Sequence, residues 1–341
     1  QGAPRGSVGE LPRWAYVTLA YDSMGKSDRL FSVVPLARAL QRLSSYPLIV
    51  LTNTTHFPDG TEVKQSLQRL NAYILPVFHV ERPDGKRFDF EAWNVAFWKL
   101  QIWKLTQFEK LIWLDSDSML YRSMDWLFSR SGMWAQRDDW FCKLNQPKVC
   151  SGIMLMYPNA SDFHGLLRYS RRHTKLDRGD QQLISMYFQH HRRKRIHLLT
   201  DLEAAFGQCL GKAPTPYRNK DGTPVRGVWN VPSFVHKSGG WGNTDNNVYN
   251  NVCFSHNMTR QYYKVGDLVL NVCHYHPLGV YWRGLFCEAT TRLHIHLPEV
   301  DAFCSDDCWY RGRGDFCRPV SATAGHRSLP RVGLPVPELA V

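Results

Sequence analysis

Two aspartates, Asp115 and Asp117, stand one residue apart at the end of the apolar run LIWLDSDSMLY (111–121). Residues i and i+2 of a strand point to the same side, so both carboxylates can face one point just beyond a strand end. Like charges held this close repel each other unless a cation lies between them, and carboxylate oxygens suit Mg²⁺ or Mn²⁺. The alternative interpretation of such a pair, taken alone, is two turn aspartates that cap the next segment.

Short apolar runs alternate with helical patterns around this pair. The strand-like runs are 15–20, 47–52, 72–78, 110–115, 152–157 and 196–199. They are apolar on both faces, as buried parallel strands are. The helical stripes are Leu36, Ala39, Leu40 and Leu43, and then Phe90, Trp93, Phe97, Leu100 and Trp103. The alternation predicts an α/β fold, with a mostly parallel sheet flanked by helices and a ligand site at the carboxyl ends of its strands.

The part of the chain after residue 206 has a different composition. Residues 207–265 are rich in Gly, Asn, Pro and Trp without a sustained period, which predicts loops that shape a substrate cleft. A last strand is expected at 267–275. We therefore expect one domain over 14–282, a loop-rich, cysteine-rich extension over 283–317 packed on it, and disordered ends at 1–13 and 318–341.

The bulk composition is that of a globular protein with a large core and a basic surface. The 341 residues are 43% hydrophobic and carry a formal net charge of +12. The basic clusters 168–175 (RYSRRHTK) and 190–195 (HHRRKR) form either a solvated face or a surface for phosphates, anionic glycans or acidic membranes. No zinc-finger or RNA-binding signature accompanies them, so we expect no nucleic-acid partner. No apolar run is long enough to span a bilayer, and a chain without an initiating Met leaves room for a membrane anchor or signal peptide removed from the N-terminus.

Cysteine usage indicates an oxidising compartment. Five of the nine cysteines lie in the last quarter of the chain: Cys273, Cys287, Cys304, Cys308 and Cys317. Disulfide bonds are therefore expected, and the odd total leaves at least one thiol free or paired with another chain. Sequons at Asn53, Asn159 and Asn257 agree with the secretory pathway. The alternative is a zinc site built from Cys304, Cys308, Cys317 and either His294 or His296.

Five blocks, in order, resemble the glycogenin-like, family 8 retaining glycosyltransferases, which use a sugar nucleotide and a divalent metal. The blocks are WAYVTLAYD (14–22), WKLQIWKLTQFEKLIWLDSDSMLYRSMDWLF (98–128), CSGIMLMYP (150–158), DRGDQQ (177–182) and NVCHYHPLGVYW (271–282). They resemble the family's first strand and nucleotide loop, its acidic motif, its "NSG" strand, its "DGGDQ" segment and its final "HF-G-KPW" loop. The resemblance covers residues 14–282 and implies a GT-A type fold.

The resemblance also implies roles for individual residues. Asp115, Asp117 and His274 are expected to bind the metal, with His276 as the alternative imidazole. An imidazole among the ligands favours Mn²⁺ over Mg²⁺. Lys99 is expected to meet the donor phosphates, although a solvated lysine is the simpler interpretation. The remaining residues expected around the donor are Leu19, Tyr21, Asp22, Ser116, Asp138, Ser151, Gly152, Asp177, Asp180 and Gln181. Asp115 is also expected near the ribose, and Asp177 is alternatively a helix cap.

The implied reaction is sugar transfer with retention. Asp180, with Gln181 beside it, is the candidate catalytic group, either as the nucleophile of a covalent intermediate or as the stabiliser of positive charge during front-side attack. The donor implied is a nucleoside diphosphate hexose or hexuronic acid, with UDP as the carrier, and the acceptor is a glycan, glycolipid or protein. A Golgi or otherwise lumenal enzyme, or a secreted one, fits the cysteines better than a cytoplasmic enzyme does, and a homodimer is left open.

The chain departs from the family pattern at three positions. Cys150 replaces the asparagine before Ser-Gly, while Pro277 and Val280 replace a glycine and a lysine of the last loop. Losing that lysine removes a charge-assisted contact to the diphosphate. These changes keep a second hypothesis open, a non-catalytic sugar-nucleotide or glycan-binding relative. A third hypothesis is a basic protein that coats anionic polymers, whose binding would be strongly sensitive to salt.

Overall fold

A seven-stranded mixed sheet forms the centre of the structure, in the order β3-β2-β1-β4-β7-β6-β8. The computed structural model describes residues 12–20, 28–81, 95–138, 148–173, 179–206, 216–218, 224–229, 232–236, 260–265, 268–273 and 277–305. The strands of this sheet are β1 (Trp14–Leu19), β2 (Leu48–Leu51), β3 (Ala72–Leu75), β4 (Lys110–Leu114), β6 (Met133–Arg137), β7 (Val149–Met156) and β8 (Ile196–Leu198). The apolar runs therefore predicted six of these seven strands, apart from their ends, and missed β6, in which polar residues interrupt the apolar ones.

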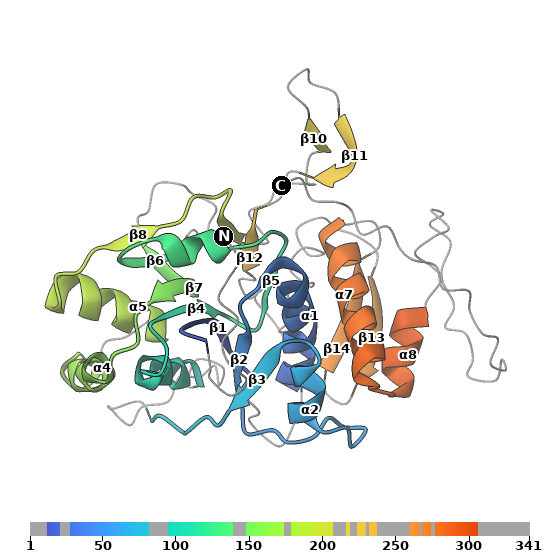
Figure 1. Cartoon of the computed structure of the whole chain (residues 1–341), viewed down its shortest axis with the longest axis horizontal. Coiled ribbons are helices and arrows are strands. Elements are labelled where there is room, and N and C mark those ends of the chain that lie inside the picture. Colours follow the sequence, from blue (N-terminus) through green and yellow to red (C-terminus); the bar gives the residue numbers. More distant parts are fainter. Residues whose placement is uncertain are drawn as a thin grey trace.

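Helices cover both faces of this sheet (Figure 1). On one face lie α1 (Asp28–Leu43), α2 (Val63–Gln68) and α7 (Pro277–Leu293), followed by α8 (Pro298–Ser305) beside α7. On the other face lie the 3₁₀ helix η1 (Phe97–Lys104), α4 (Ala160–Arg172), α5 (Gly179–Ser185) and the π-helical turn η3 (Met186–His191). The predicted α/β architecture, a mostly parallel sheet flanked by helices, is confirmed.

Alternation along the strands divides the core into two clusters. In β1, Tyr16 packs with α1, whereas Ala15 and Val17 pack with η1 on the other face. In β4, Ile112 and Leu114 lie on the first face and Trp113 lies on the second. Because both faces are covered, these strands are apolar throughout, as the sequence showed.

One central strand runs against its neighbours. β7 pairs antiparallel with both β4 and β6, whereas β1, β2, β3 and β4 pair in parallel and so do β6 and β8. An all-apolar strand carries no signal for its direction, so a parallel β7 was the natural expectation from sequence. The reversal brings the first half of β7 to the sheet edge where β4 ends, which is where the candidate site lies.

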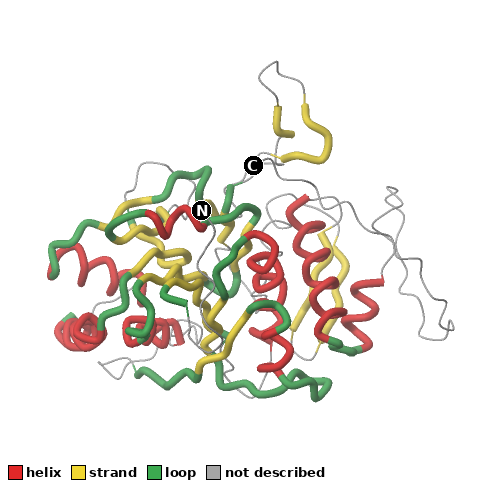
Figure 2. Tube along the Cα trace, viewed as in Figure 1, coloured by secondary structure: helices red, strands yellow, loops and turns green. Residues whose placement is uncertain are grey.

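Small sheets include several short strands from the segment that was predicted as loops. β5 (Ser118–Leu120), β12 (Phe234–His236) and β9 (Ala204–Phe206) form one sheet in that order. β10 (Pro216–Arg218) pairs with β11 (Pro224–Trp229), and β13 (Arg260–Val265) pairs with β14 (Leu268–Cys273). Figure 2 shows these strands, with the hairpin of β10 and β11 standing away from the central sheet. The loop prediction for 207–265 is therefore wrong at β10, β11, β12 and β13, because strands this short or this rich in polar residues leave no period to detect.

The last described part of the chain, residues 277–305, is helical rather than loop-rich. Residues 277–282, predicted as the family's last loop, are the first turns of α7, and Tyr281 and Trp282 are buried in the core. Cys287 of α7 forms a disulfide bond with Cys304 of α8. The zinc alternative required Cys304 as a ligand, so the disulfide contradicts it.

Residues 306–317 lie outside the described residues, as do both predicted disordered ends except residues 12 and 13. The short turn helix η2 (Asp125–Ser129) completes the described elements.

Candidate metal and donor site

The acidic pair lies in a turn between β4 and β5, just past the end of a buried strand. The backbone N–H of Asp115 donates to Gly152 O at 2.9 Å, which continues the ladder between β4 and β7. The backbone N–H of Ser118 donates to Asp115 O at 3.1 Å and closes the turn. Ser116 lies between the two aspartates in this turn, half-buried. This confirms the predicted placement of both carboxylates at the carboxyl end of β4.

His236 is the imidazole that completes this cluster. β12 pairs antiparallel with β5 in a register that sets His236 opposite Ser118, one residue past Asp117. Its Nε2 lies 3.3 Å from Asp115 Oδ2 and 3.6 Å from Asp117 Oδ1. Ligand atoms of the three side chains all lie within 4.8 Å of one another, and this is the one such metal-compatible group among the described residues.

The predicted imidazole ligands, His274 and His276, lie outside the described residues. Sequence reasoning missed His236 because the segment around it gave no strand period. A signal was present in FVHKSGG (234–240), a short apolar run that ends in a histidine ahead of two glycines. Attention went instead to 271–282, because that block resembles the family's last loop.

Space for the His236 ring depends on a glycine. A Cβ placed on Gly152 would lie 2.3 Å from Nδ1 and 2.6 Å from Cε1 of His236. Real Cβ atoms do not approach other atoms so closely, so any side chain at position 152 would displace the ring. The same Nδ1 lies 3.5 Å from the Sγ of the buried, free Cys150.

Lys99 links the acidic pair to the second half of the site. Its buried Nζ lies 2.8 Å from Asp115 Oδ1 and 3.1 Å from Asp180 Oδ2. It also donates to Ser151 Oγ at 2.9 Å and lies 5.0 Å from the centre of the Trp113 ring. The solvated-lysine interpretation is therefore wrong, because Lys99 is 5% exposed and surrounded by site residues.

Hydrogen bonds join the other described residues that are expected around the sugar-nucleotide donor. Ser151 Oγ donates to Asp180 Oδ2 at 2.9 Å, and Gln181 Nε2 donates to Asp138 Oδ2 at 3.0 Å. Gln181 Oε1 also accepts from the Ser151 backbone N–H at 3.4 Å. Asp138 directly follows β6, and Asp180 and Gln181 belong to the first turn of α5.

Three of the residues expected around the sugar-nucleotide donor have no described position. Tyr21, Asp22 and Asp177 lie outside the described residues. Leu19 ends β1 and packs partly buried against the second core cluster. The structure therefore brings together Lys99, Asp115, Ser116, Asp117, Asp138, Ser151, Gly152, Asp180 and Gln181, and adds His236 and Cys150.

The electrostatics of this cluster favour a cation. Burial alone would raise the pKa of Asp115, but the Lys99 charge and the hydrogen bond from His236 lower it to about 2. Burial likewise opposes the charge on Lys99, yet Asp115 and Asp180 raise its pKa above the ordinary value. Asp115 therefore stays ionised, and Lys99 stays charged between Asp115 and Asp180.

The same charged groups also shift the pKa of the His236 imidazole. Burial opposes a charge on His236, while the contact with Cys150 and hydrogen bonds to Asp115 and Asp117 raise its pKa well above the ordinary value. An imidazole binds a metal only when neutral, so a divalent ion between the carboxylates would replace this proton. Two carboxylates and an imidazole suit a divalent ion of the Mn²⁺ type. Burial raises the pKa of the Cys150 thiol, which keeps it neutral.

Known proteins resemble this chain over part of its length. No protein-family model matches it. The chain is 31% identical over 137 residues to glycogenin of Neurospora crassa, covering 38% of this chain and 19% of the relative. It is 25% identical over 189 residues to a putative UDP-glucuronate:xylan alpha-glucuronosyltransferase 5 of Arabidopsis thaliana, covering 55% of this chain and 31% of the relative. The chain thus spans less than a third of either relative's length.

A solved structure of the galactosyltransferase LgtC with donor and acceptor sugar analogs aligns with 66% of this chain and 87% of that chain, at 14% identity and a TM-score of 0.48. The sequence relatives confirm the predicted resemblance to glycogenin-like glycosyltransferases. In the part of the chain that the structure describes, no helix combines the length and apolar character needed to cross a bilayer.

Proposed function

We propose that this chain is a metal-dependent retaining glycosyltransferase of the glycogenin-like family, with a GT-A type fold. It transfers a hexose or hexuronic acid from a nucleoside diphosphate sugar, with UDP as the carrier, to a glycan, glycolipid or protein. The observation that carries this proposal is the cluster of Asp115, Asp117 and His236 beside the chain from Lys99 to Asp180. The resemblance supplies the reaction class, and the geometry supplies a place for the donor.

Asp115, Asp117 and His236 would hold Mn²⁺, with Mg²⁺ as the alternative ion. The bound ion would supply charge neutralisation on the leaving nucleoside diphosphate. Lys99 orients both halves of the site, because one buried ammonium binds Asp115 on the metal side and Asp180 on the sugar side. Because this ammonium is buried and contacts both, it fixes the positions of the Asp115 and Asp180 carboxylates relative to each other.

Asp180 is the candidate group at the reacting sugar. Both Lys99 and Ser151 contact its Oδ2, which fixes the position of the carboxylate. It serves either as the nucleophile that forms a glycosyl ester or as the charge that stabilises a front-side ion pair. Gln181 and Asp138 offer amide and carboxylate groups for the sugar hydroxyls, and the leaving phosphate accepts the acceptor's proton.

A lumenal or secreted location, with the Golgi as one such compartment, goes with this proposal. The disulfide between Cys287 and Cys304 supports it, because such bonds persist in oxidising compartments. Asn159 of one sequon is exposed and caps α4 by accepting from the Ser161 backbone N–H through Oδ1, which leaves its amide nitrogen for a glycan.

The second candidate function is a non-catalytic sugar-nucleotide or glycan-binding relative. It is favoured by Cys150, which replaces a family asparagine and contacts the candidate ligand His236 instead of presenting an amide. Such a protein would bind a UDP-sugar without releasing UDP.

The test is a panel of UDP-sugars with and without Mn²⁺, read out as released UDP. We expect slow, Mn²⁺-dependent hydrolysis that Asp117→Ala reduces by about a hundredfold or more, since one lost metal contact of roughly 2.7 kcal/mol has that effect. Asp201→Asn, which changes an exposed carboxylate that is not part of the cluster, should keep wild-type turnover. Near-normal turnover by the Asp117 variant would refute the metal assignment, and binding without turnover in the wild type would favour the second candidate.

A further inference from the structure

The indole of Trp113 donates to one carboxylate oxygen of Asp115. Its Nε1 lies 2.7 Å from Asp115 Oδ1. Trp113 belongs to β4 and is only 1% exposed, and residues two apart along a strand point to the same side, so the two side chains meet where the strand ends. The metal binding proposed for this cluster does not yet account for this buried donor.

Lys99 contacts the same oxygen of Asp115. Its Nζ lies 2.8 Å from Asp115 Oδ1 and 5.0 Å from the centre of the Trp113 ring, so the ammonium and the indole lie side by side. The other oxygen, Oδ2, lies 3.3 Å from His236 Nε2, which in turn lies 3.6 Å from Asp117 Oδ1. Two donors therefore occupy Oδ1, while Oδ2 faces the imidazole and the second carboxylate.

This division of the two oxygens limits what Asp115 can offer a metal ion. A carboxylate oxygen has about two lone pairs, and the ammonium and the indole engage both of those on Oδ1. Ca²⁺ takes roughly six to eight oxygen ligands and uses both oxygens of some carboxylates, whereas Mg²⁺ requires a nearly octahedral set, which Mn²⁺ also adopts. A carboxylate restricted to one oxygen therefore favours the smaller, six-coordinate ions.

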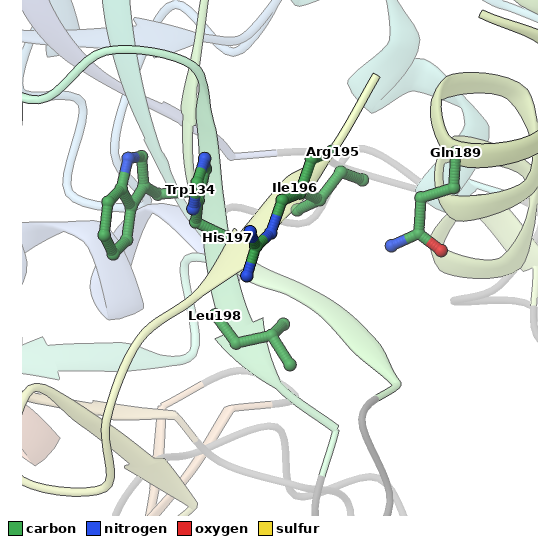
Figure 3. A pocket seen from close by; sticks show the side chains of 6 residues that line it. All are labelled: Trp134, Gln189, Arg195, Ile196, His197 and Leu198. Carbon is green, nitrogen blue, oxygen red and sulfur yellow. The ribbon is translucent and has the colours of Figure 1, made fainter. Parts of the chain in front are cut away.

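The hollow beside β8 shows no such convergence. Figure 3 shows Trp134 and His197 together on one side of the strand and Gln189 on a helix on the other side. The rings of His197 and Trp134 are stacked with their centres 4.8 Å apart, and no carboxylate lines the hollow. Within the described residues, buried donors and metal-compatible carboxylates therefore meet at the end of β4.

We propose that Trp113 is a positioning residue that restricts Asp115 to one metal-binding oxygen and thereby selects Mn²⁺ or Mg²⁺ over Ca²⁺. This inference rests on the proposed function, because it requires that the acidic cluster binds a metal. Lys99 holds the same oxygen but also contacts Asp180, whereas the indole hydrogen bond acts on the metal side alone. The simpler interpretation is a buried indole that takes the nearest acceptor, with consequences for stability only.

The test compares the Mn²⁺ and Ca²⁺ affinities of the wild type and of Trp113→Phe by calorimetry, with no sugar nucleotide present. Phenylalanine keeps an aromatic ring beside Lys99 but has no N–H, so Asp115 Oδ1 loses one donor and becomes available to a metal ion. We expect the ratio of Mn²⁺ affinity to Ca²⁺ affinity to fall about five- to tenfold, as the loss of one hydrogen bond to a charged group predicts.

Trp103→Phe is the matched control. It removes the same atoms from an equally buried ring, which stacks on Phe188 with ring centres 5.5 Å apart instead of donating to the acidic cluster. This variant should lose stability but keep the wild-type affinity ratio. Trp113→Leu, which also lacks an N–H, should lower the ratio as Trp113→Phe does and replaces that variant if it does not fold.

An unchanged ratio in the folded Trp113 variants, or an equal fall in Trp103→Phe, would overturn the proposal. Binding of Ca²⁺ to the wild type as tightly as Mn²⁺ would overturn it as well. Absence of Mn²⁺ binding by the wild type would refute the metal assignment, and the proposed function with it. Wild-type Mn²⁺ binding with an unchanged ratio in the variants would refute the role of Trp113 alone, so the two failures are distinguishable.

Discussion

The position of one imidazole decides what the acidic pair can bind. Asp115 and Asp117 are adjacent in sequence, but His236 reaches them only through the pairing of two three-residue strands, β5 and β12. Lys99, Asp180 and Gln181 could be predicted from motifs because each lies within a block of recognisable sequence. His236 could not, because three residues carry no period and its partner strand is more than a hundred positions away.

At this residue scale, Gly152→Ala tests whether the His236 ring must lie where it does. The added Cβ would overlap the ring, so we expect the ring to move, Mn²⁺ affinity to fall about tenfold or more, and stability to fall by about 1–3 kcal/mol. Calorimetric titration with Mn²⁺ and chemical denaturation measure the two effects.

Gly284→Ala is the matched control for that substitution. Nothing lies within 4 Å of a Cβ at position 284, and the residue is within α7. This variant should keep Mn²⁺ affinity and gain about 0.5–1 kcal/mol of stability. Unchanged Mn²⁺ affinity in Gly152→Ala would mean that the ring position does not control metal binding.

Among the elements, the contact between α1 and α7 carries a buried charge. The guanidinium of Arg38 in α1, 8% exposed, hydrogen-bonds to Glu288 of α7. Burial opposes ionisation of Glu288, but Arg38 and its neighbours Arg42 and Arg292 lower the pKa of this carboxyl below its ordinary value. The helix pair was not predicted from sequence, because residues 277–282 were assigned to a loop.

This pairing predicts how stability depends on pH. A carboxyl with a lowered pKa stabilises the folded state above its unfolded pKa, about 4.3, and that contribution is lost as pH falls through the folded pKa. Glu288→Gln should therefore flatten the acid side of the stability curve and lower stability at pH 7. Since Glu288 is 37% exposed, its own contribution is reduced by solvent to about 1 kcal/mol or less.

Urea denaturation between pH 3 and pH 7 measures this effect. Glu62→Gln is the control, because Glu62 makes no ion pair within the described residues and precedes α2. If the wild type and Glu288→Gln lost stability in parallel on acidification, the ion pair would not be formed in solution.

The disulfide between α7 and α8 is a second link at this scale. It joins residues 17 positions apart, and a loop of that size contributes about 3 kcal/mol in the chain-entropy description. Cys304→Ser should lower the melting temperature under non-reducing conditions, and a reductant should lower that of the wild type but not that of the variant. Identical melting of both proteins without reductant would contradict the bond.

For the whole molecule, the sheet sets the position of the candidate site. Parallel strands β1, β4 and β6 end at one edge, and the reversed β7 adds Cys150, Ser151 and Gly152 to that edge. The apolar runs predicted every strand of this sheet except β6, and they predicted the edge, since burial on both faces leaves a clear sequence signal. The same burial hides strand direction, so the contribution of β7 to the site could be recognised only by motif.

The basic run before β8 belongs to the same scale. The run 190–195 was visible in the sequence, but sequence could not separate Arg192 and Lys194, which form ion pairs with Asp162, from Arg193 and Arg195, which form none among the described residues. That division depends on the path of the chain after the π-helical turn.

The central claim is that Asp115, Asp117 and His236 bind one divalent cation. Its most direct test is the Mn²⁺ affinity of His236→Ala, measured by electron paramagnetic resonance beside His274→Ala and the exposed control His164→Ala. We predict a loss of about 30-fold or more for His236→Ala, equivalent to roughly 2 kcal/mol, and wild-type affinity for the other two variants. Wild-type affinity in His236→Ala together with a large loss in His274→Ala would contradict the claim.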